Sequence, residues 1–121
     1  MNNHSKLRNL KLRVPEAAVV TQIRKIRPNL SNACPIRFFL YFATEDTATK
    51  AAAVLRRGNF VVGIVPSIGA SPWFCLATKD MLPETAALVV LRGDMVKLAR
   101  QYGGEYDGWE AEISDESVCA G

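Results

Sequence analysis

The segment that restricts the fold most is the apolar run at residues 36–42, IRFFLYF. Its β-branched and aromatic side chains are typical of a buried β-strand. Successive side chains of a strand point to opposite faces of a sheet. One face carries only large apolar groups, and we expect the helices to pack there: Ile36, Phe38, Leu40 and Phe42. The other face carries Arg37, Phe39 and Tyr41.

A helix is expected directly after this strand. Thr44 is a typical N-cap, and the carboxylates of Glu45 and Asp46 complement the positive end of the helix dipole. Small and apolar residues recur at spacings of three and four between positions 48 and 55, which indicates one buried face. Gly58 is a natural residue for the C′ position, so we expect the helix to end just before it.

Two further strands follow, NFVVGIV at 59–65 and PWFCLAT at 72–78. The turn between them, PSIGAS, is so short that the strands are expected to run antiparallel. A last strand is expected at 105–113, EYDGWEAEI. Within it, Asp107 and Gly108 are expected to form a bulge or bend. Such a bulge turns Trp109 inward onto the helices and leaves Tyr106 or Asp107 outside.

The longest helix is predicted to open with Pro83 at its first position and to continue to about Tyr102. Its apolar residues recur at spacings of three and four: Leu88, Leu91, Met95, Leu98 and Tyr102. Gly93 lies within this helix and costs up to ~1 kcal/mol relative to Ala, so we expect local packing to require a small residue there. Gly103 and Gly104 are expected to end the helix, with one glycine at positive φ.

The resulting order, β-α-β-β-α-β, predicts an α+β, ferredoxin-like fold. Right-handed crossovers place both helices on one face of a four-stranded antiparallel sheet. The first and third strands are then central, and the second and fourth lie at the edges. We expect this domain to span residues 35–114. Residues 1–34 form a basic leader, flexible or partly helical, and residues 115–121 form a short tail. Since the compact domain begins only near Pro35, the translation start stays open.

Charge is distributed unevenly along the chain. Residues 1–34 carry seven basic side chains against one acidic, a net charge of +6, whereas residues 35–121 carry −3. No apolar run is long enough for a membrane helix or for the apolar region of a signal peptide. The chain has three scattered cysteines and a single histidine, His4. Their number and spacing do not fit a disulfide framework or a zinc site. These features predict a cytoplasmic protein with reduced thiols.

The sequence offers no catalytic grouping. His4, the only histidine, lies in the leader, so no serine or cysteine has an imidazole base beside it. The glycines form no phosphate-binding pattern. Cys75 is expected to be an inert buried thiol. The carboxylates of the last strand are best explained as a solvated, charged edge. We therefore expect no enzymatic activity, no cofactor and no metal.

Each central strand is expected to present at least one large aromatic on the face that no helix covers. Such a face suggests protein binding or self-association as a homodimer. Direct nucleic-acid binding through these aromatics and the basic leader is an alternative, although the domain is acidic and lacks a basic–Gly–aromatic consensus. In a third interpretation the leader folds over the sheet. The candidate partner-binding residues are Phe39, Tyr41, Phe74, Tyr106 and Asp107, with Trp109 expected in the core.

Three segments carry a resemblance to a known family: YFATEDTATKAAAVLRRGNFVV, PWFCLATKDMLP and GGEYDGWEAEI. Together they resemble the regulator of ribonuclease activity B family over roughly residues 36–113, with EYDGWE as the most specific piece. The resemblance implies a ferredoxin-like fold. It also implies a non-catalytic protein that binds ribonuclease E and inhibits RNA cleavage.

Overall fold

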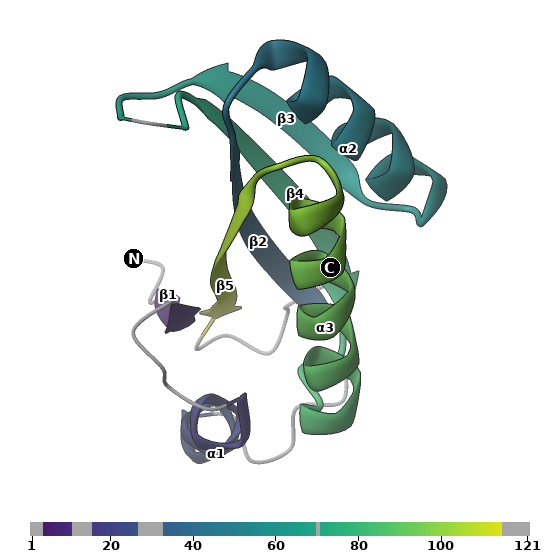
Figure 1. Ribbon diagram of the computed structural model, residues 1–121. Coiled ribbons are helices and arrows are strands. Elements are labelled where there is room, and N and C mark those ends of the chain that lie inside the picture. Colours follow the sequence, from purple (N-terminus) through teal and green to yellow (C-terminus); the bar gives the residue numbers. More distant parts are fainter. Residues whose placement is uncertain (1–3, 11–15, 27–32, 70, 115–121) are drawn as a thin grey trace.

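Five strands and three helices make up the parts of the chain described by the computed structural model, residues 4–10, 16–26, 33–69 and 71–114. Figure 1 shows their arrangement. In chain order they are β1 (His4–Leu10), α1 (Glu16–Ile26), β2 (Cys34–Phe42), α2 (Glu45–Arg57), β3 (Val61–Pro66), β4 (Trp73–Met81), α3 (Thr85–Gln101) and β5 (Glu105–Ser114). None of the described helices is both long and apolar enough to cross a bilayer.

The strands form one antiparallel sheet in the order β1-β5-β2-β4-β3. The predicted α+β fold is confirmed, since the sequence from β2 to β5 has the β-α-β-β-α-β order and the first and third of these strands are central. One detail differs from the prediction. The last strand was expected at an edge, but β5 lies inside the sheet because β1 pairs with it from His4↔Ser114 to Leu10↔Gly108.

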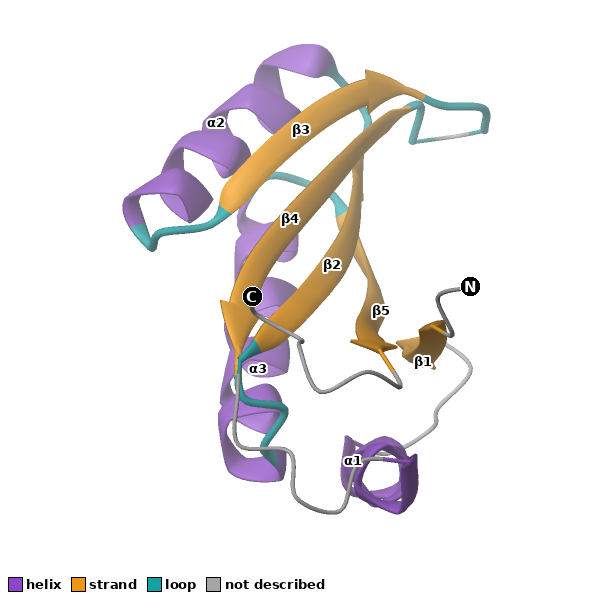
Figure 2. Ribbon diagram, turned by 180° about the vertical axis from the view of Figure 1, so that it is seen from behind, coloured by secondary structure: helices purple, strands orange, loops and turns teal. Residues whose placement is uncertain are grey.

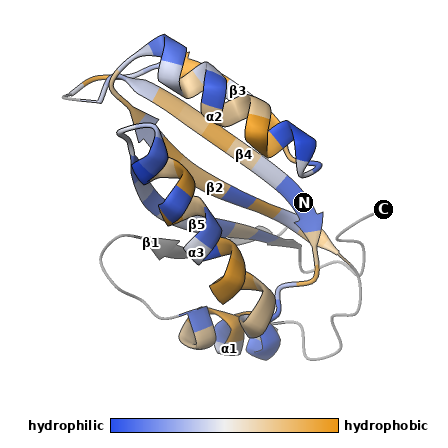
Figure 3. Cartoon of the chain, turned by 45° about the vertical axis from the view of Figure 1, so that its right-hand side comes forward, coloured by the Kyte–Doolittle hydropathy of each residue, from blue (hydrophilic) through white to orange (hydrophobic). Residues whose placement is uncertain are grey.

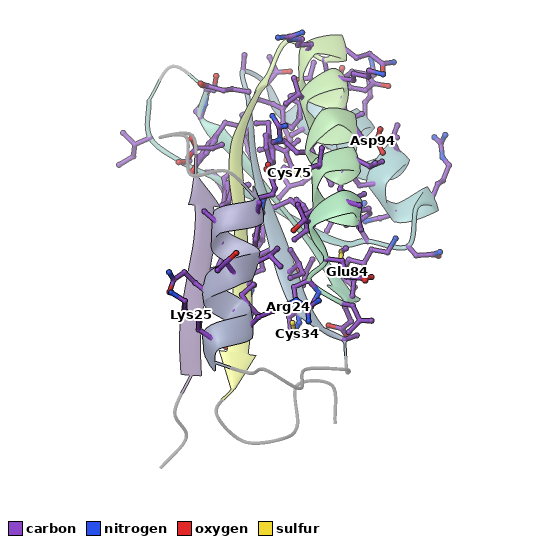
Figure 4. The ribbon with its side chains drawn as sticks, turned by 90° about the horizontal axis from the view of Figure 1, so that it is seen from below. Arg24, Lys25, Cys34, Cys75, Glu84 and Asp94 are labelled. Carbon is purple, nitrogen blue, oxygen red and sulfur yellow. The ribbon has the colours of Figure 1, made fainter. Side chains whose placement is uncertain are left out.

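Part of the predicted leader packs with the domain. Residues 1–34 were predicted to be a basic leader, flexible or partly helical; in its described part β1 extends the sheet, and the helix α1 contacts β1 and α3. The physical reason is the apolar face of α1, where Val19, Val20 and Ile23 are buried in the core. Figure 4 shows α1 between β1 and α3. Residues 1–3, 11–15 and 27–32 of this segment, and the predicted tail at 115–121, lie outside the described residues.

The sheet has a helix-covered face and an open face. The helix-covered face of β2 carries the predicted apolar residues, and all four are fully buried: Ile36, Phe38, Leu40 and Phe42. Figure 2 shows the sheet from its open side, with α2 and α3 behind β3, β4 and β2. Among the described elements, no helix lies on that open side.

The ends of α2 follow simple capping chemistry. As predicted, Thr44 is the N-cap, and its hydroxyl accepts a hydrogen bond from the amide of Thr47 at 3.1 Å. Gly58 stands at the C-cap, but its φ of −88° does not use the freedom of glycine. The residue at positive φ is Asn59, at 70°. Asparagine tolerates this region better than other side chains do, so the turn closes one residue later than expected.

The helix α3 begins at Thr85, two residues later than predicted, and Glu84 is its N-cap without a side-chain capping bond. The expectation that packing requires a small residue at Gly93 is wrong, because a Cβ there would meet no atom within 4 Å. Gly103 takes the predicted positive φ, at 68°. Gly104 has a different role. A Cβ at Gly104 would collide with the Phe42 ring and the Tyr41 carbonyl, so the chain passes too close to β2 for any side chain.

The predicted bulge lies in β5. Between the pairs Phe38↔Trp109 and Leu40↔Tyr106, β5 has one more residue than β2, and Gly108 has a φ of 107°. Trp109 is fully buried, as predicted. Because of the extra residue, Tyr106 and Trp109 both stand opposite helix-facing residues of β2. The bulge therefore brings two aromatics of β5 to the same side of the sheet.

The two glycines of α3 and its C-terminal turn make a matched pair of stability tests. Gly104→Ala is expected to lower the free energy of unfolding by about 1–3 kcal/mol, because the added methyl group has no room beside Phe42. Gly93→Ala is expected to raise it by about 0.5–1 kcal/mol, because the methyl group enters open space and favours the helix. Urea unfolding monitored by circular dichroism measures both values. Equal effects of the two substitutions would contradict this placement of α3 and β5.

Candidate functional site

An aromatic cluster lies on the open face of the sheet. It consists of Phe39 and Tyr41 from β2 and Phe74 from β4, all half-buried. The ring centroids of Tyr41 and Phe74 are 5.0 Å apart, and those of Phe39 and Phe74 are 6.0 Å apart, in tilted geometry. These distances are typical of favourable aromatic pairs. Three of the five predicted contact residues are thus gathered into one surface feature.

The aromatic cluster continues into an apolar strip that reaches the edge of the sheet. Leu76 lies beside Phe74 along β4, and Val61 and Val65 of β3 stand in register with Thr78 and Phe74. Val61 is 77% exposed and Val65 is 50% exposed. The opposite face of the same strands carries the buried residues Val62, Cys75 and Ala77, and Figure 3 shows α2 packed along β3 and β4. The open face is therefore apolar without a described element to bury it.

A charged group borders the aromatic cluster on its other side. The guanidinium of Arg37 lies 2.8 Å from a carboxylate oxygen of Glu112 and 3.7 Å from one of Glu110. Glu110 is buried, with a residue exposure of 4%. A buried carboxylate requires such a partner, because desolvation of an isolated charge is costly. The sequence suggested a solvated edge for these carboxylates, whereas the structure places them in an inner strand with Arg37 as their partner.

Strand β1 brings basic residues beside this group. In the backbone register, Lys6 pairs with Glu112 and Arg8 pairs with Glu110. The basic segment and the acidic strand are thus direct neighbours in the sheet. Sequence reasoning missed this pairing, although alternating basic residues at 6 and 8 were a signal for it.

The remaining two predicted contact residues lie at the bulge of β5. Asp107 is half-buried there. Tyr106 is in register with helix-facing Leu40 and packs against the core, and its hydroxyl is buried without a hydrogen-bond partner. Tyr106 is thus on the opposite side of the sheet from the aromatic cluster.

Tyr106 sits beside an ion pair between two helices. A carboxylate oxygen of Glu16 in α1 lies 3.0 Å from the Nε of Arg92 in α3, and Glu16 is buried while Arg92 is half-exposed. Burial raises the pKa of Tyr106 well above its usual range, the negative charges of Glu16 and Asp107 add to this rise, and Arg92 opposes it. Tyr106 therefore stays a neutral phenol. The ion pair connects α1 to α3 next to it.

The structure offers little for catalysis. Burial raises the pKa of the Cys75 thiol to about 11, against a weaker opposing effect of the Arg56 charge. A protonated thiol is a poor nucleophile. The side chains of Cys34 and Cys75, labelled in Figure 4, are both buried. Within the described ranges, no group of three or more His, Cys, Asp or Glu residues could hold a metal ion.

Comparison with known proteins adds one finding. The family model described as regulator of ribonuclease activity B (RraB) matches residues 16–111. This range begins at the first residue of α1 and includes the aromatic cluster, the bulge and Arg37. No curated protein and no solved structure matches the chain.

The buried phenol gives the first prediction for this region. Tyr106→Phe removes a hydroxyl that has no hydrogen-bond partner, so the free energy of unfolding is expected to stay within about 0.5 kcal/mol or to rise. Chemical denaturation measures the change. A loss of about 1.5 kcal/mol or more would show that the hydroxyl does bond to a neighbour.

The raised thiol pKa predicts a dependence of stability on pH. The thiol of the unfolded chain ionises near the ordinary cysteine pKa of 9.0, whereas the folded thiol holds its proton up to a pKa of about 11. The folded state binds more protons in this window, so stability is complete below pH 9.0 and falls as the pH rises to about 11. We expect the urea midpoint to fall less steeply in Cys75→Ala over the same window. Parallel pH profiles of the two proteins would refute this origin.

Proposed function

The chain belongs to the regulator of ribonuclease activity B family, and we propose that it binds a ribonuclease of the E type through the open face of its sheet. The family name describes a regulator of ribonuclease activity. The observation that supports this particular surface is the aromatic cluster of Phe39, Tyr41 and Phe74, which continues into an apolar strip. Aromatic side chains with an apolar surround are enriched where proteins bind one another.

Regulation on this proposal requires no chemistry from the chain itself. Cys75 is held as a neutral thiol by its burial, and the carboxylates of Glu16 and Glu112 form ion pairs with arginines. Inhibition then follows from occupancy. The bound regulator covers part of the ribonuclease that the RNA substrate or an associated protein would otherwise contact. Such a complex forms in the cytoplasm, where RNA is degraded.

The five candidate contact residues take different roles in this proposal. Phe39, Tyr41 and Phe74 form the centre of the contact. Asp107, half-buried at the bulge, lies at its border. Tyr106 supports the site from the helix-covered side by packing, since its hydroxyl is buried there. The partner therefore meets one central aromatic group with polar residues around it, the common anatomy of a protein interface.

Direct RNA binding is less well supported by the same surface. Single-stranded RNA needs basic groups for its phosphates beside the stacking rings. Here the residues beside the aromatic cluster on β5 are acidic: Glu105 stands in register with Tyr41, and Glu110 with Arg37. The basic residues Lys6 and Arg8 of β1 stand in register with carboxylates. Arg37, on the same face as the rings, is already paired with Glu110 and Glu112, so it is less available to a phosphate.

A binding assay with aromatic substitutions tests the proposal. Phe74→Ala removes the ring that both neighbours contact, and we expect about a tenfold or greater loss of affinity for purified ribonuclease E. Inhibition of cleavage of a labelled RNA should fall in parallel. Calorimetry or surface plasmon resonance measures the affinity, and circular dichroism verifies the fold of the variant.

Val90→Ala is the matched control, because Val90 is an exposed apolar residue on α3, 63% exposed, on the other side of the molecule. It is expected to bind and inhibit like the unmodified chain. Equal affinity of the Phe74 and Val90 variants would reject the open face as the contact. Absence of any binding and of any effect on cleavage would reject ribonuclease E as the partner. Strong binding of RNA alone, weakening with salt, would favour the nucleic-acid alternative.

A further inference from the structure

The edge strand β3 has an unusual composition. Its six residues, VVGIVP, include no charged side chain, and it lies at the end of the sheet order with β4 as its only described neighbour. Proteins commonly protect such an edge with charged residues, because an unpaired strand is a template for another chain. On β3 the residues that face the open side are two valines, exposed by 77% and 50%, and a glycine between them. The strand itself is apolar, and the charged group that contacts its backbone is the Arg56 guanidinium of α2, at the Val62 carbonyl.

We propose that two copies of this chain pair antiparallel through β3, about a two-fold axis at Gly63, to form one continuous sheet. The central five residues, VVGIV, read almost the same in both directions. Antiparallel pairing about Gly63 therefore places Val61 opposite Val65 of the second copy, and Val62 opposite Ile64. Apart from the Gly63 pair on the axis, every pair joins two β-branched residues, which are favourable neighbours across strands. Like charges do not oppose the pairing, since the strand has none.

The position of α2 fits this arrangement. The helix contacts both β3 and β4, and Figure 1 shows it along that side of the sheet. Adjacent strands lie about 4.8 Å apart, so β3 lies about 2.4 Å and β4 about 7 Å from the two-fold axis. A helix centred above them then lies about 10 Å from its symmetry mate, which is a normal distance for packed helices. At this distance the two α2 helices would pack against each other.

The charges of α2 are complementary to themselves in this geometry. Its first turn is acidic, with Glu45 and Asp46, and its last turn is basic, with Arg56 and Arg57. A two-fold axis perpendicular to the sheet makes the two helices antiparallel. The acidic turn of one copy then approaches the basic turn of the other at both ends. This charge complementarity selects a second copy over an unrelated acidic or basic strand as the occupant of the edge.

The pairing is limited to residues 61–65 of β3. Pro66 lacks an amide hydrogen, so the ladder ends there. The carbonyl of Val62 accepts a hydrogen bond from the Arg56 guanidinium at 2.9 Å. A carbonyl oxygen has two lone pairs, so it can accept a second bond from a neighbouring strand.

The open faces of the two copies then form one surface with an aromatic cluster on each side of the axis. This inference does not depend on the identity of the ribonuclease.

Disulfide trapping tests the register directly. Residues directly opposite in an antiparallel pair have Cα atoms about 4.5–5.5 Å apart, within the range of a disulfide. Gly63→Cys adds a side chain where nothing lies within 4 Å. In a full-length Cys119→Ser background, we expect it to form a covalent dimer on mild oxidation with diamide. Gly93→Cys is the matched control, because its side chain also enters open space, but on α3. It is expected to stay monomeric on a denaturing gel.

A second measurement uses the protein without a cysteine probe. Light scattering after size exclusion is expected to show a dimer that becomes monomeric in the double variant Val61→Lys, Val65→Lys, whose fold is verified by circular dichroism. Val90→Lys, at an equally exposed valine on α3, should leave the dimer intact. A monomer at all concentrations, or a dimer that the double variant leaves intact, would overturn the proposal. Cross-linking at position 93 but not at 63 would do the same. Phe74→Ala is expected to lose ribonuclease binding and to stay dimeric, so a failure of this proposal and a failure of the proposed function give different results.

Discussion

The strict alternation of β2 is the constraint on which the rest of the structure depends. Its helix-facing residues are fully buried, and its opposite residues are only half-buried. Because β2 lies between β4 and β5, its pleat sets which face each neighbouring residue takes. A shift of one residue would exchange the two faces. The same alternation therefore determines both the core beneath the helices and the aromatic cluster on the open side.

The bulge in β5 adds one residue to the strand and so changes which face of the sheet the residues before it take. With simple alternation, Tyr106 and Trp109 would point to opposite faces of the sheet. The positive φ of Gly108 accommodates an extra residue, and both aromatics then face the helices. Trp109 fills the centre of the core, while Tyr106 packs beside the Glu16–Arg92 ion pair. The most specific segment of the family resemblance, EYDGWE, thus has a structural explanation in the bulge.

Sequence patterns predicted the fold where local chemistry decides it, and failed where distant segments meet. The cap at Thr44, the alternation of β2 and the bulge all follow from residue types at fixed spacing, and each is confirmed. The pairing of β1 with β5 joins segments about one hundred residues apart, and the alternating basic residues of β1 indicate it only when they are compared with the acidic residues of β5. Gly93 shows the same limit, since an open space around a helix position is not visible in the sequence. For the candidate site, the aromatic cluster was predictable from strand order and alternation. The ion pairs of Arg37 with Glu110 and Glu112 were not, because they depend on how β2 and β5 are aligned with each other.

The central claim is that the open face of the sheet is the surface a ribonuclease recognises. Cross-saturation nuclear magnetic resonance on the labelled regulator, in complex with unlabelled ribonuclease E, measures the contact surface directly. The account predicts strong attenuation of the ring signals of Phe39, Tyr41 and Phe74, with the Val54 and Val90 methyl signals on α2 and α3 unchanged. Attenuation confined to α2 and α3, with the three rings unaffected, would contradict it.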